Sequence, residues 1–136
     1  MGAVSGADWE QRVADAWASI DRLPEAEFLA RIEQLAAELP ADSAVGRFER
    51  AAAFDSTGDP DRAVPLYQEA LDRGLTGERR RQAVIQLASS LRNLGRPGES
   101  VELLSAELDA GSDQLDDAVR AFLSLALVDV GREREA

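Results

Sequence analysis

The side chains that usually carry out covalent or acid–base catalysis are scarce in this chain. Its 136 residues include no histidine and no cysteine. A nucleophile and its base would therefore have to come from serine with Asp, Glu or Arg. No Gly-x-Ser-x-Gly motif is present to expose such a serine. We predict no catalytic residue, no cofactor and no enzymatic activity, and an enzyme is the third alternative behind the two binding functions described below.

Carboxylates do cluster, but at positions where their charge has a structural use. Glu25 with Glu27, and Asp113 with Asp116 and Asp117, lie at the starts of predicted helices, where the helix dipole favours negative charge. The segment 55–61 (Asp-Ser-Thr-Gly-Asp-Pro-Asp) resembles a calcium loop with oxygen ligands. It lacks that loop's spacing and its glutamate at the twelfth position. We therefore predict no metal site.

Three consecutive arginines, Arg79 to Arg81, begin another predicted helix, where cations oppose the helix dipole by up to about 1 kcal/mol each. Two interpretations stay open. The favoured one is pairing with nearby carboxylates, for which the candidates are Glu49, Asp55, Asp72 and Glu78. The other is an edge that recognises an anion, with Arg92 further along the same helix.

Composition narrows the classes of partner. The formal net charge is −11, and all 15 basic residues are arginine. Binding to nucleic acid or to an anionic membrane surface depends on a basic footprint, so neither is expected as the main target. No stretch approaches the roughly 20 apolar residues of a membrane span, and residues 1–7 do not resemble a signal peptide. Without cysteine nothing argues for an oxidising compartment, so a cytoplasmic location is predicted.

Outside the turns, apolar residues recur at helical spacing and no segment alternates as a strand does. We predict an all-α fold of seven helices: three helical hairpins and one extra C-terminal helix. The predicted helices span residues 8–20, 24–39, 44–56, 60–73, 78–94, 97–108 and 114–130. Asp8, Asp42 or Ser43, Asp59 and Thr76 are the candidate N-caps. The predicted domain organisation is a flexible tail at 1–7 and a single domain at 8–136, divided into 8–40, 44–73, 78–109 and 114–136.

A glycine-led phrase returns along the chain at nearly constant spacing. Gly58, Gly95 and Gly131 lie 37 and 36 residues apart, and each precedes a short charged segment that ends in Ala, Ser or Val. A period in this range is typical of stacked helical repeats, in which no unit can bury its apolar face alone.

With the hairpins placed, the repeat resembles the tetratricopeptide repeat. The unit 44–73 carries the family's pattern of small and large residues: Ala51, Phe54, Gly58, Ala63, Tyr67 and Ala70. The next unit keeps Ala88, Leu91 and Gly95 but has Ser100, Leu104 and Glu107 at the later positions. The last unit retains Leu123, Ser124, Leu127 and Gly131, and 8–40 is a diverged repeat or a capping hairpin with Ala16 as its small residue. The resemblance implies a right-handed superhelical α-solenoid, and an irregular helical bundle is the alternative.

The family's first helices line a concave groove, so the resemblance implies a protein–protein interaction module, a scaffold or adaptor that binds a peptide or helix there. Gln82, Gln86, Ser89 and Asn93 form one uncharged polar stripe, while Val84, Leu87, Ala88, Leu91 and Leu94 are expected to face inward. The predicted partner-binding set is Phe48, Asp55, Gln82, Ile85, Gln86, Ser89, Arg92 and Asn93. An ordinary solvated face is the alternative interpretation of the stripe.

A second function comes from the last predicted helix, which has no hairpin partner. Part of its apolar surface is expected to be uncovered, and such surface usually marks an interface. The alternative function is therefore a structural self-assembly unit that dimerises through Leu123, Leu125, Leu127 and Val128.

Overall fold

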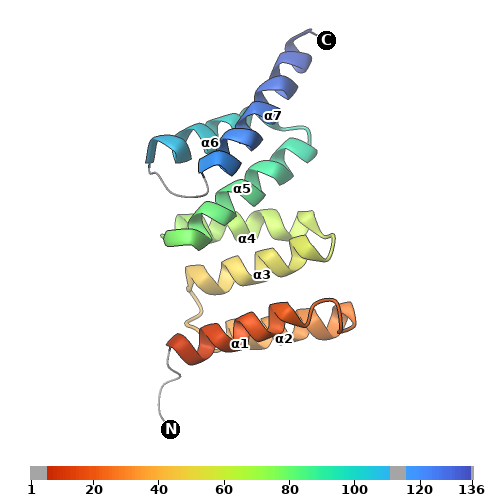
Figure 1. Cartoon of the computed structure of the whole chain (residues 1–136), viewed down its shortest axis with the longest axis vertical. Coiled ribbons are helices and arrows are strands. Elements are labelled where there is room, and N and C mark those ends of the chain that lie inside the picture. The colour runs from red at the N-terminus through yellow and green to blue at the C-terminus, as the bar shows by residue number, and fades with distance from the viewer. Residues whose placement is uncertain (1–5, 111–115, 136) are drawn as a thin grey trace. The chain divides into compact units, whose positions relative to one another are not determined.

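The chain is all-helical where the structure describes it. The structure is a computed structural model; it describes residues 6–110 and 116–135, with side chains for 6–109 and 117–131. These residues form seven α-helices and no strand, as predicted (Figure 1). Residues 1–5 of the predicted tail, the predicted linker 111–113 and Ala136 lie outside the described residues.

Two compact units divide the chain, one over residues 1–73 and one over 74–136. The first unit contains α1 (Gly6–Ala18), α2 (Glu25–Ala37), α3 (Ala44–Ser56) and α4 (Pro60–Asp72). The second contains α5 (Gly77–Asn93), α6 (Pro97–Ala110) and α7 (Asp116–Glu135).

Two of the predicted N-caps are formed by side-chain hydrogen bonds. The Ser43 hydroxyl accepts from the Gly46 amide at 3.1 Å, and Asp59 Oδ1 accepts from the Arg62 amide at 3.3 Å. Each bond satisfies one of the free amides of a helix start. Thr76 occupies the N-cap position of α5 but makes no such bond. The prediction for Asp8 is wrong: α1 begins at Gly6, so Asp8 lies in its first turn and bonds to Arg12 at 3.0 Å.

The three repeat glycines do not behave alike. Gly58 and Gly95 follow α3 and α5 with φ of +82° and +79°, a left-handed conformation that suits glycine at a helix end. The prediction that the last helix ends at residue 130, just before Gly131, is wrong, because α7 continues through Gly131 to Glu135. Gly58 leads from α3 into α4, and Gly95 leads from α5 into α6; in each case the second helix packs back on the first. Within the described residues, no second helix follows α7.

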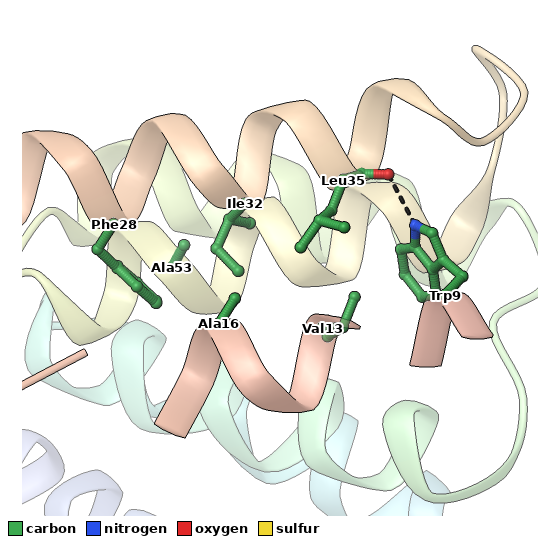
Figure 2. Close-up of a cluster of buried hydrophobic side chains, with 7 residues drawn as sticks. All are labelled: Trp9, Val13, Ala16, Phe28, Ile32, Leu35 and Ala53. Atoms are coloured by element: carbon green, nitrogen blue, oxygen red, sulfur yellow. Dashed lines mark hydrogen bonds between the residues drawn. The ribbon is translucent and has the colours of Figure 1, made fainter. Parts of the chain in front are cut away.

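The core of the first unit joins α1, α2 and α3. Figure 2 shows its seven buried side chains, which are Trp9, Val13, Ala16, Phe28, Ile32, Leu35 and Ala53. Trp9 lies at one end of this cluster, where its indole Nε1 donates to the Leu35 carbonyl at 2.8 Å. The partly buried Trp17 also packs against the cluster, and its Nε1 donates to the buried Glu49 carboxylate of α3 at 2.7 Å. The α1–α2 hairpin is therefore fastened to α3 by both packing and hydrogen bonds.

The hairpins α1–α2 and α5–α6 share one register. In the first, Trp9 donates to the carbonyl of the residue 26 positions later, Leu35. In the other, Arg81 Nη1 donates to the carbonyl of Glu107 at 3.0 Å, again 26 positions later. The same helix-to-helix contact is thus made by an indole in one hairpin and by a guanidinium in the other.

The core of the second unit centres on α5. Val84, Leu87, Ala88 and Leu91 are all buried there, as predicted, and Leu104 of α6 is fully buried. Leu94 is a correction, because its side chain is 45% exposed rather than packed inward. It occupies the C-cap position of α5, so it lies past the last turn of the apolar stripe.

Candidate functional site

The predicted polar stripe lies on the exposed side of α5. Gln82, Gln86 and Asn93 are exposed and Ser89 is half-buried. Most of the rest of the helix is buried, namely Arg81, Ala83, Val84, Ile85, Leu87, Ala88, Ser90 and Leu91. Gln82 Nε2 donates to Glu78 Oε1 at 3.4 Å, one turn earlier. The stripe is therefore a narrow, uncharged, solvent-accessible strip on a helix held firmly on its other sides.

The α3 members of the predicted set are engaged within the first unit. The Phe48 side chain is buried, and its ring centroid lies 6.1 Å from that of Tyr67 on α4. The Tyr67 hydroxyl donates to Asp55 Oδ2 at 3.0 Å. Burial, followed by the charge of Asp55 and this hydrogen bond, raises the pKa of Tyr67. Phe48 and Asp55 therefore both contact Tyr67, one through its ring and the other through its hydroxyl.

The remaining members, Ile85 and Arg92, lie on α5 itself. The Ile85 side chain is only 6% exposed, so it offers little surface to a partner. Arg92 Nε donates to Asp129 Oδ2 of α7, 37 residues further along the chain. Arg92 is therefore held within the second unit, with its side chain 28% exposed.

The arginine cluster is paired inside the second unit through Glu107, which is not among the four carboxylates predicted as its partners. Arg81 Nη1 and Arg80 Nη2 each lie 3.3 Å from a Glu107 oxygen of α6. The Arg81 and Glu107 side chains are only 7% and 4% exposed, whereas that of Arg80 is 41% exposed. This geometry favours the pairing interpretation over an anion-recognising edge, because a second anion would compete with a buried carboxylate.

The predicted self-association residues differ in exposure. Leu125, Leu127 and Val128 are 46%, 51% and 51% exposed, and Leu123 is half-buried. The buried residues of α7 include Val119 and Ala126, so α7 packs through the opposite side. In Figure 1 the α7 helix lies against α6, and its last turns extend past it.

A shift of 36 residues superimposes α7 on α5. Val119 and Ala126 then fall on Ala83 and Ser90, and all four are buried. With this shift Leu123 and Leu127 correspond to Leu87 and Leu91, which α5 buries, whereas Leu125 and Val128 correspond to Ser89 and Arg92. The four predicted residues therefore belong to two different sides of α7.

Sequence reasoning missed Glu107, Glu49 and Asp129 as partners of Arg81, Trp17 and Arg92. A signal existed for Glu107, since it replaces the alanine that the repeat has at Ala70. Among the described residues no group of three or more carboxylates could hold a metal ion. No helix in that part of the chain is long and apolar enough to cross a membrane.

A family model described as a tetratrico peptide repeat matches residues 44–136, which cover α3 to α7. A search of the curated proteins finds no match.

Proposed function

Because this chain belongs to the tetratricopeptide repeat family, we propose that it is a protein–protein interaction module whose α5 stripe binds a peptide or helix of a protein partner. Members of this family are generally interaction modules rather than catalysts. The supporting observation is the exposure of Gln82, Gln86 and Asn93 on a helix that is otherwise largely buried. Primary amides both donate and accept hydrogen bonds, so they suit the backbone of an extended peptide. A rigid helix also keeps them in position before the partner arrives.

The other members of the proposed site have supporting roles. Ser89 lies within the stripe, and the buried Ile85 holds α5 in place beneath it. Arg92, fixed by Asp129, sets the charge at one end of the stripe. Phe48 and Asp55 form a separate candidate contact on α3, organised by Tyr67. The acidic composition leads us to propose a protein rather than nucleic acid or a membrane surface as the partner, and a cytoplasmic location.

The test is the double variant Gln86→Ala/Asn93→Ala. It should leave the thermal melting curve unchanged, because both side chains are exposed, and it should weaken capture of the partner from a lysate of the source cells. The matched control is Gln34→Ala/Gln68→Ala, which removes two exposed amides from α2 and α4. Equal capture by the wild type and the α5 double variant would contradict the proposed site.

A second candidate function is self-association through α7, with Leu123, Leu125, Leu127 and Val128 at the contact. It is favoured by the exposure of three of these four side chains. Static light scattering across a dilution series tests it directly. A protein that stays monomeric at high concentration would exclude this function.

The 26-residue register also supports a role for the N-terminal hairpin. We propose that α1–α2 is a diverged repeat stacked on α3, since Trp9 and Arg81 make the same contact in their hairpins. In this proposal the residues 8–40 extend the array rather than form a separate domain.

A further inference from the structure

Among the described residues, no helix covers the side of α7 that corresponds to the α6-covered side of α5. On α5 this side, here called the hairpin face, consists of Arg81, Val84, Leu87, Ala88 and Leu91, which are all 5% exposed or less. Arg81 of this face bonds to Glu107 of α6, and α6 packs against α5. The hairpin face of α7, 36 residues later, consists of Asp117, Arg120, Leu123, Ser124 and Leu127.

The exposure of the α7 hairpin face contrasts with that of α5. The Asp117 and Arg120 side chains are 99% and 63% exposed, and Leu127 is 51% exposed. Ser124, at the place of the fully buried Ala88, is also exposed. Here a small residue remains at the centre with leucines beside it, which is the pattern that lets another helix approach closely.

Charge indicates which helix would fit. Position 81 of α5 faces position 107 of α6, and the corresponding pair one repeat earlier is Ala44 and Ala70. One repeat has two small residues at these places, and the next has an arginine opposite a glutamate. The α7 position that corresponds to Arg81 is Asp117, so the sign is reversed. Asp117 Oδ1 lies 3.6 Å from Arg120 Nη1 at the surface, where such pairing is weak and leaves the carboxylate accessible.

We propose that the hairpin face of α7 binds an amphipathic helix of a protein partner that presents a lysine or arginine to Asp117. By analogy with Ser100, Leu104 and Glu107 of α6, this helix carries a small residue, a large apolar residue four positions later and the basic residue three positions after that. A second copy of this chain fits less well. Its helices with the small–large pattern, α4 and α6, already bury those residues in their own units.

The test uses a synthetic peptide as the probe. The peptide comprises residues 96–110, which are α6 and the arginine before it, with Glu107→Arg. A covalent link between positions 102 and 106 keeps it helical, because a free peptide of this length is marginally helical in water. Both linked positions are exposed in α6, so the link leaves the binding side unchanged. Fluorescence polarisation measures its dissociation constant for the 136-residue protein. The matched peptide keeps Glu107.

The arginine peptide should bind about tenfold more tightly than the glutamate peptide, and Asp117→Arg in the protein should reverse this preference. Leu127→Asp should abolish binding of both, whereas Leu94→Asp, which changes an exposed leucine of α5, should not. Equal binding of the two peptides, or no binding of either, would overturn the proposal. So would a dimer in light scattering that Leu127→Asp dissociates, because the occupant would then be a second copy.

Discussion

Replacing Glu107 by alanine should destabilise the second unit more than any exposed substitution on the same helix. The change removes the carboxylate between Arg80 and Arg81, so the Arg81 guanidinium, whose side chain is 7% exposed, loses the charge of Glu107. Removing one partner of a buried ion pair typically costs about 3–5 kcal/mol. Two features place the expected cost at the lower end of this range, about 3 kcal/mol. Arg80 is 41% exposed and can be hydrated, and Arg81 keeps its hydrogen bond to the backbone carbonyl of residue 107.

The decisive comparison is with a variant that removes both charges. Arg81→Met/Glu107→Leu replaces the pair by apolar side chains of similar volume, which is often neutral or stabilising. We expect it to recover most of the loss, to within about 1 kcal/mol of the wild type. The surface control is Glu99→Ala, which removes a carboxylate that pairs with Arg96 at the exposed start of α6, and it should change the melting temperature only slightly.

Far-UV circular dichroism during thermal and urea unfolding measures these effects. A loss of about 3 kcal/mol corresponds to a fall of roughly 10 °C in melting temperature for a chain of this size. Both tryptophans, Trp9 and Trp17, lie in α1, so their fluorescence follows the first unit separately. If Glu107→Ala costs less than about 1 kcal/mol, or if the double variant is as unstable as the single one, the buried pair does not have the energetic role assigned to it.

Three further predictions concern the first unit and the helix ends. Ala51→Leu, at a fully buried position, should lower the free energy of unfolding by about 1–3 kcal/mol through overpacking, whereas Ala52→Leu at a half-buried position should lower it little. Urea unfolding followed by tryptophan fluorescence compares the two variants. A larger loss of stability for Ala52→Leu would show that the register of α3 is wrong. Burial raises the pKa of Tyr67 in the folded state above the value of about 10 that it has in the unfolded chain. The contribution of the neutral phenol to the free energy of unfolding is therefore complete below about pH 10 and is lost as the pH rises above that value. The free energy of unfolding of Tyr67→Phe should therefore fall less steeply with pH than that of the wild type between pH 10 and 12. Identical slopes for the two proteins would contradict this link between the pKa and stability. Gly58→Ala, at φ +82°, should destabilise the protein by about 1–2 kcal/mol, whereas Gly131→Ala inside α7 should stabilise it by up to about 1 kcal/mol. Shifts in melting temperature of the same sign and similar size would refute this difference between the two glycines.

Most of the fold follows from local signals in the sequence. Helical periodicity locates all seven helices, and the caps at Ser43 and Asp59 and the glycines at 58 and 95 place several helix ends. These signals act within a few residues, so one sequence carries them. The failure at Gly131 has the opposite cause. Glycine adopts helical as well as left-handed backbone conformations, so a glycine alone does not require a helix to end, and α7 runs through Gly131.

The candidate site is less predictable because exposure depends on contacts between distant residues. The exposed positions of the α5 stripe agree with the helical wheel, since the apolar residues of the same helix determine which side is buried. Phe48 and Ile85 could not be judged in this way. Each is a large apolar residue beside polar ones, and its burial is decided by helices that the local pattern does not describe, such as α4 for the Phe48 ring.

Two departures from expectation explain each other once the hairpin register is known. Arg81 is a cation near a helix start, where the helix dipole disfavours it, and Glu107 is an acid at a position where the repeat has alanine. Considered separately, each is an anomaly, and the sequence suggests several surface carboxylates as partners of the arginine. The register of 26 residues pairs them with each other, as it pairs Trp9 with Leu35. A buried ion pair requires both charges, so each residue makes the other necessary. By the same register, a helix packed on the hairpin face of α7 would place one of its residues against Asp117, and the charge of Asp117 is the reason for proposing a cation there.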